Sequence, residues 1–360
     1  MKKNMMIYPF GCETTPIVRN LDMIKEISVL PVASKSWSFC KNDIANFDGG
    51  SSKIEEISYD FEKSFEKCDS IYIPFERNIL TIDNYIALID KISKSQKRII
   101  ISRDLKNKLG TNISRFDEMG ACDFYDEKLE IEKEQILPIN IPVIMILGDG
   151  INCNKFDIQL SLRKYFLSKG FSVCQFGTKE YSSFFGFKSL PKFLFDSVCL
   201  KDKIIALNHL IYKEVSDKKH DLLIIGVPGG ALPISEEHPT DFGEFAYIIS
   251  NAVKPDIAIR SVYYNKYPKL FFNNDILMSK YKLSSEVEYY NIANKQLVFP
   301  YDRYSELDYL TIKNEEILNY ISIQSKETEG YMLFNSLEES NFTCVYDNIL
   351  KQLTENQVTI

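Results

Sequence analysis

Residues 143–169 constrain the fold of this chain more than any other stretch. The first five are apolar, which is typical of a strand buried on both faces. A loop with the sequence GDGINCNK follows at residues 148–155, and residues 156–169 then carry apolar side chains at helical spacing. A buried strand, a tight loop and an amphipathic helix form the layout of a phosphate-binding P-loop.

The loop keeps some residues of a standard GxxxxGK[ST] P-loop and lacks others. In that motif the glycines let backbone N–H groups surround the phosphates, the lysine meets their charge, and the hydroxyl binds Mg²⁺. Here Lys155 is present, but Asn154 replaces the glycine before it and Phe156 replaces the Ser/Thr after it. Asparagine adopts a left-handed backbone more readily than most residues, so we expect the turn to survive. Phe156 cannot ligate a metal.

A second apolar run, residues 221–233, ends in Gly229-Gly230 and resembles the strand and Gly-Gly turn of dethiobiotin-synthetase-like P-loop enzymes. The resemblance implies an acidic Mg²⁺ ligand at the end of this strand, where the chain has Gly226. With Phe156, both metal-holding side chains are absent, so we expect no metal site and no ordinary Mg-ATP hydrolysis. A nucleotide or a CoA-type phosphate compound is the expected ligand. The residues predicted to bind it are Gly148, Asp149, Gly150, Ile151, Asn152, Cys153, Asn154, Lys155, Gly229 and Gly230.

The first third of the chain predicts a separate sheet. Short apolar runs alternate there with helical patterns, which favours a Rossmann-like parallel sheet. A length of 360 residues also suggests two domains. We therefore predict an α/β protein with a Rossmann-like domain and a degenerate P-loop NTPase-like domain. The expected limits are residues 1–137 for the first domain, 138–142 for a Pro-containing linker, 143–325 for the second domain, and 326–360 for a C-terminal helical extension.

Two turns of the first domain are candidate ligand elements, and each has an ordinary alternative. Residues 10–16 follow a predicted strand but contain only Gly11 and lack the GxGxxG of dinucleotide-binding domains. They predict either a simple anion-binding turn or an ordinary strand-to-helix connection. Residues 48–52, with the sequence DGGSS, predict either a ligand loop or a flexible surface loop.

A polar loop after Pro233 supplies the candidate catalytic residues His238, Asp241 and Glu244. Together with Glu237 they have the side chains of an acid–base site or a substitute metal site. The alternative is a polar loop before a helix over residues 242–251, with Asp241 as its N-cap. Cys153 likewise has two interpretations: a reactive thiol at a helix N-terminus, or a small side chain packed inside the loop.

Composition excludes several classes of function. The net charge of −7 and pI near 5.3 argue against a broad nucleic-acid surface. No apolar run approaches the roughly 18 residues of a membrane helix, and the first residues do not resemble a signal peptide. The eight cysteines show no CxxC spacing, which favours reduced thiols and a cytoplasmic location.

Three segments give a resemblance over nearly the whole chain: residues 8–19, 148–187 and 242–256. They resemble the peptide maturation system proteins of bacterial clusters that make ribosomal Cys-rich peptides. The resemblance implies an accessory role in maturation, with the precursor peptide or a radical maturase as partner.

The two-domain plan is also similar to a wider family that includes D-glutamate N-acetyltransferases, which implies an acyl-CoA- or nucleotide-dependent group transferase as an alternative. A non-catalytic scaffold is the third hypothesis. The sequence leaves open whether the chain is an enzyme and what its oligomeric state is.

Overall fold

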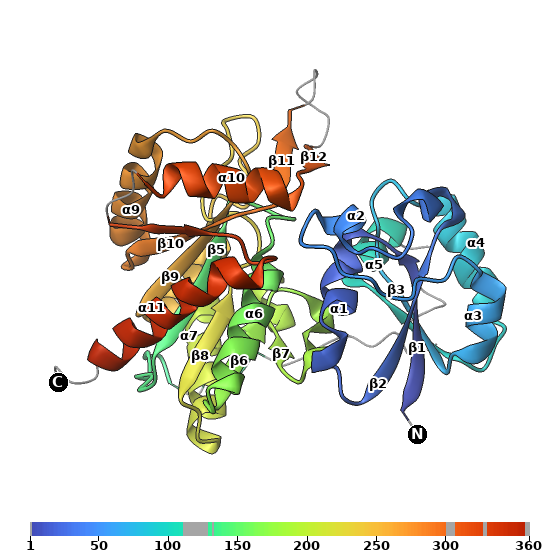
Figure 1. Ribbon diagram of the computed structural model, residues 1–360. Coiled ribbons are helices and arrows are strands. Elements are labelled where there is room, and N and C mark those ends of the chain that lie inside the picture. Colours follow the sequence, from blue (N-terminus) through green and yellow to red (C-terminus); the bar gives the residue numbers. More distant parts are fainter. Residues whose placement is uncertain (1, 111–128, 132, 300–306, 327–329, 357–360) are drawn as a thin grey trace. The chain divides into compact units, whose positions relative to one another are not determined.

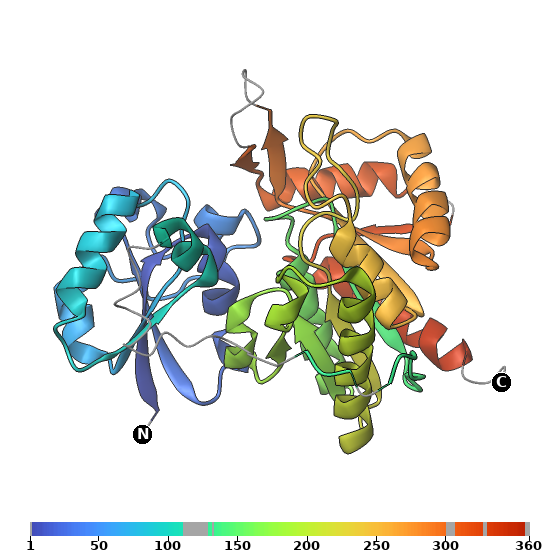
Figure 2. The same ribbon diagram turned by 180° about the vertical axis from the view of Figure 1, so that it is seen from behind.

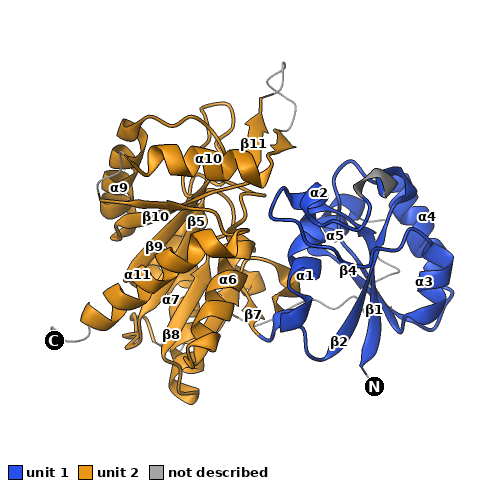
Figure 3. Ribbon diagram, in the orientation of Figure 1, with its two compact units in different colours: residues 1–124, 183–186 blue, residues 125–182, 187–360 orange. Residues whose placement is uncertain are grey.

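The chain divides into two compact units, each with its own sheet (Figure 3). The computed structural model describes residues 2–110, 129–131, 133–299, 307–326 and 330–356. Unit 1 comprises residues 1–124 and 183–186, and unit 2 comprises residues 125–182 and 187–360. The boundary at residues 124 and 125 falls outside the described ranges, and residues 183–186 are a short part of unit 1 within the second half of the chain. The predicted domain limits stay a prediction.

Unit 1 is a four-stranded parallel sheet in the order β2-β1-β3-β4. The sheet buries apolar side chains such as Met6, Ile71 and Ile99 against helix α4, whose Tyr85 and Ile89 are buried. The predicted parallel α/β architecture is confirmed for this unit. Its strands are β1 (Lys3–Phe10), β2 (Ile27–Ala33), β3 (Ser70–Ile73) and β4 (Arg98–Ile101), and its helices are α1 (Thr15–Arg19), α2 (Ala45–Asp48), α3 (Phe61–Lys67), α4 (Ile82–Ile92) and α5 (Arg103–Leu109).

Unit 2 contains a seven-stranded sheet in the order β13-β10-β9-β5-β8-β6-β7, in which every neighbouring pair is parallel. The central strand β5 (Val143–Gly148) is buried along its whole length, as its apolar sequence predicts. Its carboxyl end lies between those of β8 and β9, so the loops that follow these strands meet at one edge of the sheet. The other strands are β6 (Val173–Gly177), β7 (Lys188–Ser189), β8 (Leu222–Gly226), β9 (Ile257–Val262), β10 (Val287–Ile292) and β13 (Met332–Phe334).

Helices cover both faces of this sheet. On one face Ile144 and Ile146 pack against α6 (Lys155–Ser168) and α11 (Glu339–Asn356), which lie in front of the sheet in Figure 1. On the other face Val143, Met145 and Leu147 belong to a core that includes α7 (Leu200–Asp217) and α8 (Glu244–Ala252), which lie in front in Figure 2. The same core takes in α9 (Lys269–Leu283) and α10 (Asn314–Gln324).

The C-terminal segment contributes to this sheet. Strand β13 pairs with β10, and α11 buries Val345, Tyr346 and Ile349 on the face that α6 also covers. An antiparallel hairpin of β11 (Lys295–Val298) and β12 (Asp308–Thr311) follows β10. No helix in the described part of the chain is both long and apolar enough to span a bilayer.

Candidate functional site

The loop between β5 and α6 makes a compact turn. Asn152 and Asn154 both have a φ of 57°, in the left-handed region. Asn154 precedes the first residue of α6, and its side chain donates to Asp157 Oδ2 at 2.8 Å. The prediction that asparagine would preserve the turn is confirmed, because it tolerates this conformation and also bonds to the first turn of the helix.

Several N–H groups of this loop are free to bind an anion. Among the hydrogen bonds of the described residues, none uses the backbone N–H of Asn152, Asn154 or Lys155 as its donor. Lys155 also begins a helix of 14 residues. Unpaired N–H groups at a helix N-terminus, together with the helix dipole, favour a negatively charged ligand.

Lys155 joins the loop after β5 to the loop after β8. Its ammonium group donates to the carbonyl oxygen of Gly150 at 2.8 Å and to that of Gly229. The side chain is only 7% exposed, and burial lowers the pKa of Lys155 while the nearby Lys179 lowers it further. Asp149 and Asp241 act in the opposite direction. Because an ammonium group has three donors, two carbonyl acceptors leave one for a ligand.

Gly229 and Gly230 allow the loop after β8 to approach the loop after β5 closely. Gly229 has a φ of 63°, and the carboxylate of Asp241 lies where its side chain would be. A Cβ at Gly230 would lie 2.6 Å from the carbonyl oxygen of Asp149. The structure therefore brings the two predicted groups of ligand-binding residues, 148–155 and 229–230, to one place.

A network of charged residues centred on Arg260 holds the loop in place through Asp149. Arg260 in β9, 3% exposed, donates from Nε and Nη2 to Asp149 Oδ1 at 3.1 and 2.8 Å. Its Nη1 donates to Asp275 Oδ1 at 2.5 Å, and the Tyr290 hydroxyl donates to Asp275 Oδ2 at 2.9 Å. Burial alone would lower the pKa of Arg260, but the two carboxylates raise it overall. Asp149 is thus held and neutralised by the protein itself.

The residues that stand at the metal-ligand positions do not fit Mg²⁺. Phe156 packs against the rings of Tyr181 and Phe187, with centroids 5.2 and 6.0 Å away. At Gly226, a Cβ would lie 2.5 Å from the amide group of Gln159, which is fully buried. An aromatic cluster and a neutral amide therefore occupy the places of a hydroxyl and a carboxylate, the oxygen ligands that Mg²⁺ requires.

Gln159 instead connects α6 to the end of β6. Its Nε2 donates to the Lys155 carbonyl oxygen at 3.0 Å and to the Thr178 hydroxyl at 3.2 Å. Its Oε1 accepts from the Thr178 N–H at 3.3 Å. This side chain places residues 178–179 beside the first turn of α6.

The hairpin side of the loop is closed by an apolar cluster. Buried Cys153 and Tyr263 pack there with Ile234, Leu297 and Tyr309. The Cys153 thiol donates to the Gly150 carbonyl oxygen at 3.1 Å, and the Tyr263 hydroxyl donates to the Ile151 carbonyl oxygen. The packing interpretation of Cys153 therefore holds, because the thiol is 1% exposed.

The three candidate catalytic residues each lie against a different group, and their acid–base role stays a prediction. Glu244 pairs with Lys203 at 3.2 Å, the His238 ring lies 6.0 Å from that of Phe299, and Asp241 lies at Gly229. Within the described ranges, no group of three or more His, Cys, Asp or Glu side chains could hold a metal ion. A substitute metal site at His238, Asp241 and Glu244 is therefore not formed.

Asp241 is not the N-cap of α8, so that prediction is wrong. The helix begins at Glu244 with Gly243 as its N-cap, at a φ of 75°. Thr240 and Phe242 also have left-handed backbones, with φ of 53° and 50°. These conformations prevent a helix from starting at residue 242.

In unit 1 the candidate anion-binding turn binds a side chain of its own unit. The buried carboxylate of Glu76 accepts from the N–H groups of Glu13 and Thr14, each at 3.1 Å, and from the Thr14 hydroxyl at 3.0 Å. A Cβ at Gly11 would lie 2.5 Å from this carboxylate. The single glycine therefore makes room for Glu76.

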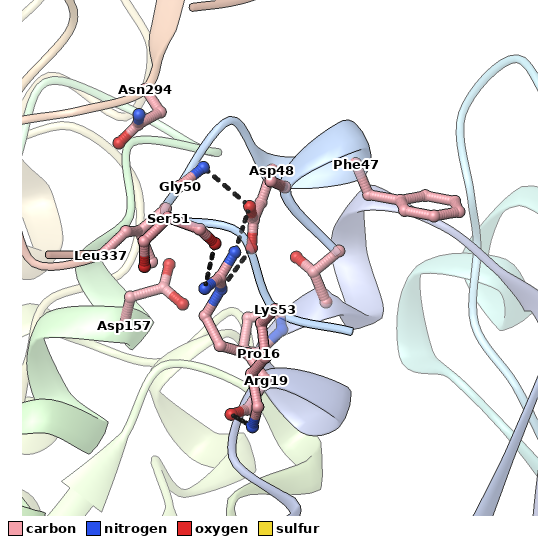
Figure 4. Close-up of polar contacts among 12 residues, drawn as sticks. Pro16, Arg19, Phe47, Asp48, Gly50, Ser51, Lys53, Asp157, Asn294 and Leu337 are labelled. Atoms are coloured by element: carbon pink, nitrogen blue, oxygen red, sulfur yellow. Dashed lines mark hydrogen bonds and ion pairs between the residues drawn. The ribbon is translucent and has the colours of Figure 1, made fainter. Parts of the chain in front are cut away.

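The DGGSS segment is also tied to its own unit. Arg19 donates to both oxygens of Asp48 at 2.7 Å and to the Ser51 carbonyl oxygen at 3.0 Å (Figure 4). The Gly50 N–H donates to Asp48 Oδ1 at 2.9 Å. These bonds hold residues 48–51 to Arg19 of α1. The ligand-loop and surface-loop interpretations both stay predictions.

Comparisons with known proteins identify the fold. No family model and no curated protein matches this chain. A DUF1611 family protein from Anabaena variabilis matches 97% of this chain and 100% of its own, with a TM-score of 0.63 and 12% sequence identity. At that identity the likeness shows a shared α/β fold along the whole chain and nothing about activity.

Two weaker structural likenesses carry no argument. A nucleotide-binding protein from Archaeoglobus fulgidus, solved with ADP, has a TM-score of 0.32 and 13% identity, over 54% of this chain and 80% of its own. Chloroplast FtsY from Physcomitrella patens has a TM-score of 0.24 and 11% identity, over 68% of this chain and 82% of its own. The resemblance to peptide maturation system proteins stays a prediction.

The sequence patterns assigned no role to Arg260 or Gln159. The sequence does contain an indication for Arg260, because it is the one charged residue within the apolar run at residues 257–262. A charge inside a buried strand requires buried partners. The sequence contains no such indication for Gln159, because a glutamine in an amphipathic helix is usually exposed.

Proposed function

We propose that this protein binds a phosphate-bearing ligand at residues 148–155 and 229–230, without the metal chemistry of ordinary Mg-ATP hydrolysis. The observation that carries the proposal is Lys155, a buried ammonium group beside unpaired loop N–H groups. Phe156 and Gln159 at the metal-ligand positions support the second half of it. A nucleotide or a CoA-type compound is the class of ligand proposed.

The biological setting that we propose is the maturation of a ribosomal peptide, with the precursor peptide or a radical maturase as partner. It rests on the sequence resemblance alone. Copurification of the chain with a tagged precursor peptide or with a tagged radical maturase tests it. Failure to copurify with both would remove this setting while leaving the ligand site intact.

Calorimetric titration of the wild type and of Lys155→Ala with ATP, GTP and acetyl-CoA tests the ligand site. Each titration is run with EDTA and with Mg²⁺. We expect at least one ligand to bind in EDTA and to lose about tenfold or more in affinity in Lys155→Ala, because a charge-assisted hydrogen bond is lost. Binding of acetyl-CoA alone would favour the group transferase, and binding of none would favour the scaffold. Tight binding of ATP only with Mg²⁺ would contradict the proposal.

A further inference from the structure

Helix α9 has apolar side chains on the face that points away from the core. The helix lies at the periphery of unit 2 (Figure 1). Its buried side chains recur every three or four residues and face the core: Phe272, Asp275, Ser279 and Leu283. At 100° per residue, Leu270, Leu277 and Tyr281 lie on the opposite side, and they are 65%, 53% and 81% exposed. A helix at a protein surface ordinarily has a polar outward face, so α9 departs from the usual pattern.

The exposed apolar side chains lie along one line on the helix surface. Leu270 and Leu277 are two turns apart, Tyr281 is one turn further on, and the exposed Met278 beside Leu277 widens the strip. At a rise of 1.5 Å per residue the strip is about 16 Å long. The loop before α8 reaches the same end of α9, because the Lys282 ammonium group donates to the carbonyl oxygen of the exposed Phe242 at 3.2 Å. Exposed apolar surface bordered by polar and charged groups is typical of a docking site for another molecule.

The border of the strip is cationic. Residues 266–286 contain four lysines: Lys266, Lys269, Lys280 and Lys282. The two carboxylates of this segment are already paired, Asp275 in the core with Arg260 and Glu286 with Lys280. In the part of the chain that the structure describes, neither Lys266 nor Lys269 has an ion-pair partner. Since the chain as a whole has a net charge of −7, this segment is a local excess of positive charge.

Two occupants of the strip are disfavoured by these side chains. Lysines lie near both of its ends, so two α9 helices from two copies of the chain would place lysine against lysine, whether they packed parallel or antiparallel. A bilayer is disfavoured because the exposed Asn274 lies in line with Leu270 and Leu277, and hydrocarbon offers its amide no hydrogen-bond partner. A polypeptide can supply both carboxylates for the lysines and a hydrogen-bond partner for the amide.

We propose that the outward face of α9 is a docking site for a helical peptide segment that has an apolar stripe and acidic flanks. Leu270, Leu277 and Tyr281 pack against the stripe, and Lys266 and Lys269 attract the carboxylates. Side chains four residues apart on α9 form ridges, and a ridge of a second helix lies in the groove between them. This interaction surface does not depend on the phosphate-bearing ligand proposed above.

Fluorescence anisotropy with two synthetic peptides tests the inference. Both peptides carry the same leucine stripe at helical spacing, and their flanking positions are all glutamate in one and all lysine in the other. The full chain is titrated into each labelled peptide. We expect the glutamate peptide to bind about tenfold or more tightly than the lysine peptide, and the difference to shrink at high salt because salt screens the charges.

Two substitutions locate the site on α9. Leu277→Gln is expected to weaken binding of the glutamate peptide about tenfold, because an apolar contact is lost. Its matched control is Leu310→Gln, the same substitution in β12 at a side chain that is 55% exposed. Lys269→Gln is expected to weaken binding about two- to fivefold, because an ion pair at the border stays hydrated. Lys213→Gln, at an exposed position of α7, is its control.

Thermal melting of each variant checks that it folds. If Leu277→Gln binds the glutamate peptide as Leu310→Gln does, the face of α9 is not the docking site. Failure of the wild type to bind this peptide would overturn the acidic partner. A wild-type dimer in sedimentation that Leu277→Gln separates would assign the face to a second copy instead. Cosedimentation with vesicles of phosphatidylcholine and phosphatidylglycerol, abolished by Leu277→Gln, would assign it to an anionic membrane.

Discussion

Lys155 is the residue on which the ligand proposal depends, and its environment has two opposite consequences. Burial lowers the pKa of its ammonium group, so the free protein holds this charge less firmly than an exposed lysine would. A bound anion stabilises the charged form and raises the pKa again. Ligand binding and proton binding at Lys155 are therefore coupled.

This coupling predicts proton uptake on binding. Between the lowered pKa of Lys155 in the free protein and the raised pKa in the complex, each binding event takes up a proton, so affinity falls as pH rises through that window. Well below both values, Lys155 is charged in both states and takes up none. Calorimetry with whichever of ATP, GTP and acetyl-CoA binds, in buffers of different ionisation enthalpy, measures the uptake. Equal uptake in wild type and Lys155→Gln, which has no titrating group there, would contradict the prediction.

Arg260 is the second residue with a testable role, because it holds one carboxylate of the loop and one of α9. Removing the positive charge leaves the buried Asp275 and the mostly buried Asp149 without their cationic partner. We expect Arg260→Gln to lower the free energy of unfolding by about 3–5 kcal/mol. Arg260→Lys keeps the charge but lacks the guanidinium fork, so a smaller loss is expected. Urea denaturation measures both, and a loss in Arg260→Gln no greater than that of a surface substitution would show that the network does not stabilise the fold.

Among the elements, the strand–loop–helix unit was the most predictable from sequence. The apolar run and the helical spacing predicted β5 and α6, whose observed bounds are Val143–Gly148 and Lys155–Ser168. The left-handed backbone of Asn154 also followed from residue type. The start of α8 could not be predicted from residue type. It depends on the left-handed backbones of residues 240, 242 and 243 and on the close approach of Gly243 to Ala231.

Contacts between distant elements were not predictable from local pattern. The Glu76 carboxylate reaches a turn more than 60 residues earlier in the sequence. Gln159 likewise lies against Gly226, which is 67 positions later in the sequence, and the residues around either one do not predict this contact. Such pairings are set by the order of strands in the sheet, which the sequence pattern of each strand does not specify.

The pairing of Gly226 with Gln159 predicts a specific epistasis between β8 and α6. A methyl group at Gly226 would lie 2.5 Å from the Gln159 amide, so Gly226→Ala is expected to cost about 1–3 kcal/mol by overpacking. Gln159→Ala removes the obstructing amide and leaves a cavity that the new methyl group partly fills. The double variant is therefore expected to lose less stability than the two single variants added together. A double-mutant cycle by urea denaturation measures the coupling, and strict additivity would contradict the close contact.

At the scale of the whole molecule, the two units bury separate cores. Unit 1 packs residues such as Ile71 and Ile89 around its four-stranded sheet, and unit 2 packs Ile144, Tyr346 and Ile349 on one face of its seven-stranded sheet. Domains with separate cores are expected to unfold as separate cooperative units. The C-terminal helix α11 belongs to the second of these, since Tyr346 bonds to Ser161 of α6 at 2.7 Å.

Matched core substitutions in the two units test this independence. Tyr346→Ala removes a fully buried ring from unit 2, and Ile89→Ala removes a fully buried aliphatic side chain from unit 1. Each is expected to cost its own unit about 2–5 kcal/mol. Hydrogen exchange, measured residue by residue, is expected to show faster exchange of β5 and α6 only in Tyr346→Ala, and of β3 and α4 only in Ile89→Ala. A variant that speeds exchange equally in both sheets would show instead that the chain unfolds as one unit, because loss of either core would then expose the other.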